Sequence, residues 1–318
     1  MGRIALFTAV DQYPTGPLQG SVADADRIRS LLAHHEGDAA NFDCRLISNA
    51  QVTRSNLRHQ IQQLFANRDA ELTLFFFAGH GLLTGPQPHQ QAVLKTIDSV
   101  PGDEGVPMDW LLGQANASQA KERIIILDCC HAGAIDQLLA PNSSIALAEG
   151  VSVLAATRSG DAAEEASGKG IFSDHIHAAL DGGAADVRGF ITTAGLFAYV
   201  DEVMTPWNKR PLYKANVAGL SRLRRARHAV ADDDLRRMAI LFPSPDHEYP
   251  LTPEYERTHA SSKPELMEIL DLLQKLRAAR LVEPIGTPHM YFAAMQSKSC
   301  RLLPLGKAYW QQVRNNRI

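Results

Sequence analysis

Two apolar runs that end abruptly in reactive residues constrain this chain more than any other feature of its sequence. Arg123–Leu127 is a β-branched run typical of a strand buried on both faces of a parallel sheet, and it is followed by Asp, Cys, Cys and His. A second run, Leu72–Phe77, is followed by Ala, Gly, His and Gly. Because the chemistry of open α/β sheets gathers beyond the carboxyl ends of the strands, the sequence predicts that a thiol and His80 meet at one edge of the sheet.

A cysteine and a histidine at the same sheet edge can form a nucleophile and its base. The thiolate attacks, and the imidazole activates the thiol and later protonates the leaving amine. Each residue alone has a structural explanation, since a cysteine at a strand end is usually a small buried hydrophobe and a histidine there is often a satisfied loop residue. Two such strand ends, each bounded by a glycine turn, favour catalysis.

The two strand ends also carry a family resemblance. The motifs F-F-F-A-G-H-G at 75–81 and L-D-C-C-H-A-G at 127–133 resemble those of the caspase-like clan of cysteine peptidases, and are most similar to those of metacaspases and the bacterial orthocaspases. The signatures of that family are a strand followed by a small residue and Gly-His-Gly, and a second strand followed by Asp-X-Cys-His-Ser-Gly. Ala132 replaces the serine here. The resemblance covers residues 1–220, which we expect to form the peptidase domain.

The resemblance implies a role for each residue of the two motifs. Cys130 matches the nucleophile and His80 the general base and acid, whereas Cys129 falls at a variable position and His131 follows the nucleophile without acting as a base. Neighbouring residues of a strand point to opposite faces, so only one of the two cysteines is expected to reach the imidazole. The backbone N–H groups of Cys130 and Gly81 are the implied donors to the tetrahedral oxyanion.

Two carboxylates suggest the substrate that such a site accepts. Asp128 stands at the motif position that lines the specificity pocket of metacaspases, and the segment 18–25 resembles their Leu-x-Gly-x-x-x-Asp-Ala sequence, which places the second pocket acid at Asp24. Two anions favour a guanidinium or an ammonium group, and animal caspases, which cleave after Asp, carry a Gln in place of the first acid. The alternatives are structural: a helix N-terminal acid for Asp24 and a turn residue for Asp128.

The stretch 157–170 is rich in Gly, Ala, Ser and acidic residues and is predicted to be an exposed loop. Metacaspases carry Ala and Glu there before a Gly-x-Phe-Ser segment, which residues 164–166 and 170–173 match. Some metacaspases need calcium, but no EF-hand spacing is present. No Cys-x-x-Cys or His-x-x-x-His spacing surrounds the thiols either, so we expect no cofactor, with activation by calcium left open as the alternative.

Composition indicates the compartment and excludes several classes of partner. The 318 residues are 45% hydrophobic and 21% charged, with a net charge of −3, which gives no reason to expect membrane or nucleic-acid binding. No apolar run is long enough to span a bilayer, and no signal-peptide core follows Met1. Four cysteines, two of them adjacent, do not make a disulfide framework. We therefore expect a cytoplasmic protein, and the resemblance to orthocaspases implies a bacterial one.

Hydrophobic periodicity predicts an α/β fold. Strands and helices alternate along the chain, which indicates a mainly parallel sheet sandwiched by helices, as the caspase-like resemblance also implies. The predicted strands are 3–10, 43–48, 72–77, 123–127 and 151–156, and the predicted helices are 23–34, 53–67, 108–114, 172–180 and 192–204.

The last hundred residues differ in character. A run of arginines and a Pro-rich segment suggest a linker over 221–263. Residues 264–318 then resemble, diffusely, a winged helix in an α+β arrangement. Because only scattered basic residues are present, we favour a regulatory or protein-binding module that recruits an activator over a DNA-binding domain.

Together these features predict a cysteine endopeptidase that cleaves proteins after Arg or Lys. Two alternatives stay open, an inactive caspase-like scaffold and a DNA-binding regulator. Because a free peptidase of this specificity would damage its host, we expect a zymogen that is controlled by self-cleavage or by a partner. The candidate cut sites are Arg158, Lys169 and the arginines of the run, namely Arg222, Arg224, Arg225 and Arg227.

Overall fold

The computed structural model describes residues 2–86, 90–130, 146–156, 165–166, 169–204 and 210–318. The chain divides into two compact units. The first comprises residues 1–185 and 190–226, and the second comprises 186–189 and 227–318. Within the described ranges, no helix combines the length and the apolar character that crossing a bilayer requires.

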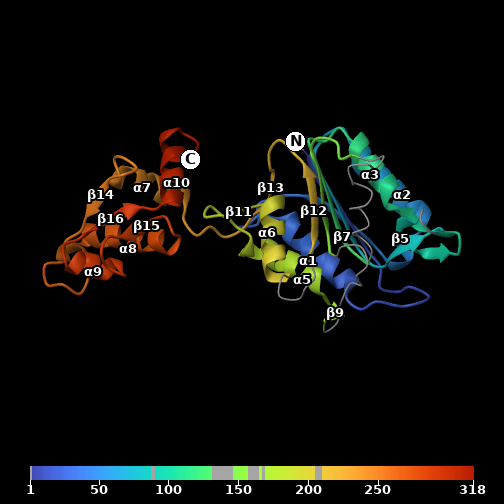
Figure 1. Ribbon diagram of the computed structural model, residues 1–318, viewed down its shortest axis with the longest axis horizontal. Helices are drawn as coiled ribbons and strands as arrows, with labels where there is room; N and C mark the ends of the chain where they lie inside the picture. Colours follow the sequence, from blue (N-terminus) through green and yellow to red (C-terminus); the bar gives the residue numbers. More distant parts are fainter. Residues whose placement is uncertain (1, 87–89, 131–145, 157–164, 167–168, 205–209) are drawn as a thin grey trace. The chain divides into compact units, whose positions relative to one another are not determined.

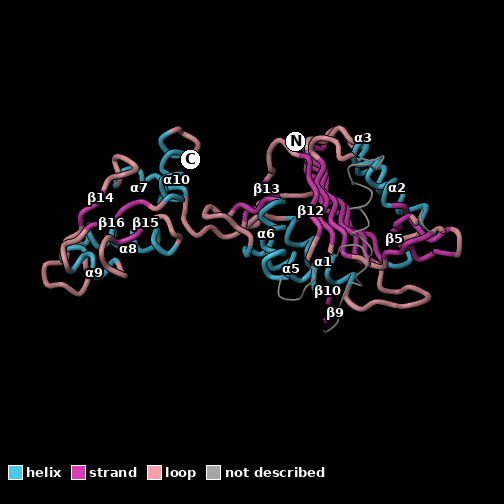
Figure 2. Tube along the Cα trace, viewed as in Figure 1, coloured by secondary structure: helices cyan, strands magenta, loops and turns pink. Residues whose placement is uncertain are grey.

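The first unit is built on a six-stranded sheet in the order β12-β8-β7-β3-β1-β2. Figure 2 shows its strands running alongside one another. Five neighbouring strands run parallel and β12 pairs antiparallel at one edge, which confirms the predicted mainly parallel α/β sheet. The strands are β1 Gly2–Ala9, β2 Asp43–Ser48, β3 Ala70–Ala78, β7 Glu122–Asp128, β8 Val151–Ala155 and β12 Leu212–Asn216.

Helices cover both faces of this sheet (Figure 1). On one face lie α1 Ser21–Ala33, α5 Ile171–Ala178 and α6 Thr193–Met204, and on the other lie α2 Arg54–Ala66 and α3 Met108–Ala117. Alternate residues of each strand point to opposite faces, so in β3 Phe75 and Phe77 pack against α2 and α3 while Leu74 and Phe76 pack on the α1 side. This double burial explains why the central strand β3 is almost entirely apolar rather than alternating with polar residues.

Short strands add three small sheets to the first unit. The antiparallel sheet β4-β5-β6 continues directly from the turn after β3 and is formed by Gly81–Thr84, Gln91–Val100 and Asp103–Pro107. Two further pairs join β9 Glu165–Ala166 to β10 Lys169–Gly170, and β11 Phe190–Thr192 to β13 Arg222–Arg225.

The run of arginines is a strand rather than a flexible segment. Arg224 is 6% exposed, and its guanidinium donates to the carbonyl oxygens of Leu31, His34 and Leu180. The expectation that Arg222, Arg224 and Arg225 lie in a disordered cleavage segment is therefore wrong, because this backbone is paired in β13. The sequence signal was misleading because a buried arginine can be satisfied by backbone carbonyl groups.

The second unit has its own core. A three-stranded antiparallel sheet, β14-β16-β15, packs with four helices around buried leucines. Residues 227–263 make up most of the predicted linker 221–263. They contribute α7 and β14 to this unit, and Leu235 and Met238 of α7 are buried in its core. The elements are α7 Asp232–Leu241, β14 Glu248–Pro250, α8 Pro264–Ala278, β15 Val282–Pro284, α9 Met290–Met295, β16 Ser299–Leu302 and α10 Pro304–Arg314.

Candidate active site

The register of two neighbouring strands brings the predicted histidine and cysteine together. β3 and β7 are parallel, with Ala78 opposite Asp128. His80 and Cys130 each follow two residues later, so they leave the sheet side by side at its carboxyl edge. The two segments stay hydrogen-bonded where the strands end, because the N–H of Gly79 donates to the carbonyl oxygen of Asp128 at 3.1 Å.

Gly81 packs directly on the cysteine pair. A methyl group on this residue would overlap the carbonyl oxygen of Cys130 and lie 3.2 Å from the sulfur of Cys129. Only glycine therefore allows the histidine turn to lie this close to the backbone of the cysteines.

The two adjacent cysteines have different environments. Cys129 is fully buried in the hydrophobic cluster on the α2 and α3 side, whereas Cys130 is half-buried. Burial, together with the charges of Asp128 and Cys130, raises the pKa of the Cys129 thiol well above its usual value. A thiol held neutral in an apolar cluster cannot act as a nucleophile, which leaves Cys130 as the reactive candidate.

The imidazole of His80 is fixed in one tautomer. Its Nε2 lies 2.6 Å from the carbonyl oxygen of Gly16, in the loop after β1. Because a carbonyl oxygen can only accept, Nε2 must carry the proton, and the neutral ring keeps its basic lone pair on Nδ1. A backbone carbonyl therefore orients this ring, a role that a carboxylate fills in many other catalytic groupings.

Tyr13 contacts the same histidine at its ring and at its backbone. The rings of Tyr13 and His80 lie 4.7 Å apart, and the Tyr13 hydroxyl accepts from the backbone N–H of His80. A side chain on Gly79 would lie 2.5 Å from that hydroxyl, so this glycine makes room for it. The sequence carries no signal for a role of Tyr13 itself. The small residue before the histidine was the available signal that a group packs there.

The two predicted pocket acids lie close together, although 104 positions separate them in the sequence. Asp24 lies in the first turn of α1 and is 1% exposed, and Asp128 is the last residue of β7. Both meet at Gly170, where a methyl group would be 2.7 Å from Oδ2 of Asp128 and 3.5 Å from Oδ2 of Asp24. Two carboxylates that converge at one point favour a positively charged partner there.

Groups of the chain itself already satisfy both carboxylates. Asp24 accepts from the guanidinium of Arg27 at 2.5 Å and from the N–H of Gly170 at 2.8 Å. The hydroxyl of Ser173 donates to Asp128. Sequence reasoning named neither Arg27 nor the role of Ser173, because both contacts depend on how α1 and α5 pack beside the sheet.

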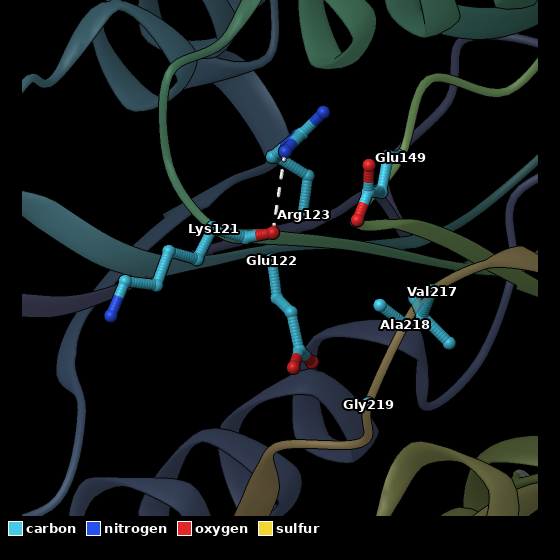
Figure 3. A pocket seen from close by; sticks show the side chains of 8 residues that line it. Lys121, Glu122, Arg123, Glu149, Val217, Ala218 and Gly219 are labelled. Carbon is cyan, nitrogen blue, oxygen red and sulfur yellow. Dashed lines mark hydrogen bonds between the residues drawn. The ribbon is translucent and has the colours of Figure 1, made fainter.

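A separate hollow of about 440 Å³ lies at the amino-terminal ends of β7 and β8. Figure 3 shows the side chains that line it. It is lined by Glu122 and Glu149 at the starts of β7 and β8, and by residues 217–219. The guanidinium of Arg123 donates to the carbonyl oxygens of Ala115, Ala120 and Lys121. The seven residues of β7 put this hollow about 20 Å from Cys130, so it is not part of the candidate active site.

Several predicted features fall outside the described residues. These are His131 and Ala132 of the cysteine motif, and Arg158 and Glu164 of the acidic loop. Among the residues that are described, no three His, Cys, Asp or Glu side chains are grouped so as to hold a metal ion.

Comparisons with known proteins agree with this architecture. The caspase domain family matches residues 2–276. A protein of known structure from Geobacter sulfurreducens is similar to the chain at 13% identity and a TM-score of 0.54, over 71% of this chain and 100% of that one. Caspase-1 from Spodoptera frugiperda has 15% identity and a TM-score of 0.49, over 71% of this chain and 90% of its own. No curated protein matches the sequence.

Proposed function

The chain belongs to the caspase domain family, and we propose that it is a cysteine endopeptidase with Cys130 as its nucleophile and His80 as its general base and acid. The observation that carries this proposal is the pairing of β3 with β7, which sets the two residues side by side, together with the Gly16 carbonyl that leaves Nδ1 of the imidazole basic. A paired imidazole activates a thiol that would otherwise be a weak nucleophile.

The proposed reaction has two stages. Nδ1 of His80 takes the thiol proton, and the thiolate of Cys130 attacks the peptide carbonyl carbon. The oxyanion that forms accepts hydrogen bonds from the N–H groups of Cys130 and Gly81. The imidazolium then gives its proton to the leaving amine, which leaves a thioester. A water molecule, deprotonated by Nδ1, hydrolyses the thioester and restores the thiol.

We further propose that the enzyme cleaves after Arg or Lys. Support comes from the convergence of Asp24 and Asp128 at Gly170, where two negative charges would attract a cation and repel an acidic side chain. The substrates would accordingly be proteins or peptides with exposed basic residues.

Fluorogenic peptides ending in Arg, Lys or Asp test these proposals directly. The expected result is hydrolysis after Arg and Lys but not after Asp, and its loss in both Cys130→Ala and His80→Ala. Cys129→Ala is the matched control, since it removes the neighbouring thiol and should retain a measurable rate. Full activity in Cys130→Ala would refute the assignment of the nucleophile.

Control by self-cleavage is a further part of the proposal. Of the candidate sites within the described ranges, Arg227 combines exposure with an irregular backbone, and it is the first residue after the first compact unit. Cleavage after Arg227 would separate residues 228–318, the segment that we propose to bind an activator. We expect purified protein to yield a fragment that begins at His228, and Arg227→Gln to abolish it. A fragment that begins after Arg224 instead would contradict this choice of site.

A further inference from the structure

Arg27 occupies part of the site that a basic substrate would need. Its Nη2 donates to Oδ1 of Asp24 at 2.5 Å, and its guanidinium also contacts Oδ1 of Asp174 on α5 at 3.2 Å. The side chain of Asp24 is only 2% exposed, whereas that of Arg27 is 31% exposed. The buried acid is therefore covered by the half-exposed guanidinium, on the side of the carboxylate that the Gly170 N–H does not occupy.

The charges at this point are unequally shared. Asp24 and Asp128 contribute two negative charges beside Gly170, and Arg27 contributes one positive charge, which pairs with Asp24 and with Asp174. Burial lowers the pKa of Arg27, but its hydrogen bonds and charge interactions with Asp24 and Asp174 outweigh that effect and raise it above its usual value. The guanidinium is thus a permanent charge, and a substrate cation near Asp24 would meet a like charge.

We infer that Arg27 is a specificity-determining residue that competes with the basic side chain of the substrate for Asp24. This inference rests on the proposed cleavage after Arg or Lys. Arg27 neutralises Asp24, so the substrate cation binds chiefly to Asp128 and binds more weakly than two free acids would allow.

Asp174 gives the displaced guanidinium an alternative partner. It already contacts both terminal nitrogens of Arg27, at 3.2 and 3.3 Å, and its side chain is 51% exposed. When a substrate cation reaches Asp24, Arg27 can keep this second contact and turn outward without losing its counter-ion. Removing Asp174 should therefore make displacement harder and weaken substrate binding.

The chain offers a matched control on the same helix. Arg29 pairs with Asp26 at 2.7 Å, with the same three-residue spacing and 32% exposure, but Asp26 is itself 51% exposed. Loss of Arg29 removes an equivalent charge and an equivalent helix pair without changing the proposed pocket.

Steady-state kinetics on an Arg-terminated fluorogenic peptide test the inference. Arg27→Gln keeps a donor for Asp24 but removes the charge, and we expect the KM to fall about fivefold with kcat unchanged. Arg27→Lys should behave like the wild type, Asp174→Asn should raise the KM, and Arg29→Gln should leave it unchanged. A residue that only held Asp24 in place would give the opposite result for Arg27→Gln, a higher KM and a less stable protein.

The same peptide can be titrated calorimetrically against Cys130→Ala and Cys130→Ala/Arg27→Gln, which separates the two proposals. Tighter binding by the double variant supports the role of Arg27 even if the wild type hydrolyses nothing, in which case only the proposed activity fails. Hydrolysis after Arg, with identical KM values for Arg27→Gln and Arg29→Gln, would overturn the inference and leave the activity standing. Absence of binding to either protein would overturn both.

Discussion

The hydroxyl of Tyr13 accepts a hydrogen bond from the backbone N–H of His80 at 3.0 Å. It also donates to the carbonyl oxygen of Lys95 at 3.2 Å, and the phenol is 4% exposed. Burial is the main reason that the pKa of Tyr13 lies well above its usual value, so the hydroxyl stays protonated and can serve both partners. The Gly16 carbonyl oxygen accepts from Nε2 of His80. The loop after β1 therefore holds His80 both at its backbone and at its ring.

Replacing the phenol tests whether this support matters for catalysis. Tyr13→Phe leaves the N–H of His80 without its partner, which should lower the free energy of unfolding by about 1–3 kcal/mol. We also expect kcat to fall about tenfold, since a small displacement of the imidazole impairs proton transfer. Urea denaturation and peptide hydrolysis measure the two effects.

The control for that experiment is Tyr291→Phe, which removes the hydroxyl of a 41% exposed tyrosine in the second unit. It should change neither stability nor rate. If Tyr13→Phe lowers stability but leaves kcat as it was, the tyrosine supports only the fold and does not position the histidine.

Gly81 provides a sharper test of the close approach between the two strand ends. In Gly81→Ala the new methyl group would overlap the carbonyl oxygen of Cys130, and backbone atoms cannot move aside cheaply. We expect loss of hydrolysis and a destabilisation of about 1–3 kcal/mol. Gly113→Ala, on α3 with no atom within 4 Å of the added carbon, should instead stabilise the protein slightly and retain full activity. Equal activity in the two variants would contradict the geometry.

Most strands of the sheet and the helices beside it could be predicted from the sequence, because the pattern that identifies each one lies within its own segment. The apolar run at 123–127 is buried on both faces and therefore lacks alternation, and Thr53 accepts from the N–H of Asn56 as a helix cap does. β12 was not predicted. It is a short edge strand, Leu212–Asn216. Its last two residues are exposed, and its sequence shows little hydrophobic periodicity.

The candidate site was predictable only in part. His80 and Cys130 could be named because each directly follows a buried strand. Gly16 acts through its backbone carbonyl, which every residue type possesses, so no side-chain pattern could identify it. Arg27 lies three residues after Asp24 on a helix, a spacing so common on solvated helix faces that it carries no functional signal.

Thiol alkylation distinguishes the four cysteines. Burial raises the pKa of Cys44 and of Cys300 to about 12, and it also raises the pKa of Cys129 well above its usual value. At pH 8 about one in ten thousand of the Cys44 or Cys300 thiols is ionised, so iodoacetamide should label Cys130 alone.

Mass spectrometry of the alkylated peptides reads out this result. Labelling of Cys44 should increase about tenfold for each unit of rising pH, because its folded thiol ionises only near pH 12. Protein unfolded in guanidinium, in which all four thiols should react, is the control. Preferential labelling of Cys129 in the folded protein would contradict its burial.

Asp128 should determine the preference for basic residues. Asp128→Asn keeps the size of the side chain and a carbonyl oxygen for the Ser173 hydroxyl, but it removes the negative charge. A charge-assisted hydrogen bond contributes about 1.5–3 kcal/mol, so kcat/KM for an Arg peptide should fall between tenfold and about a hundredfold. Asp26→Asn, which removes a charge from the exposed pair with Arg29, should leave kcat/KM unchanged. The pocket assignment fails if Asp128→Asn cleaves after Arg at the wild-type rate, because the substrate cation would then have its partner elsewhere.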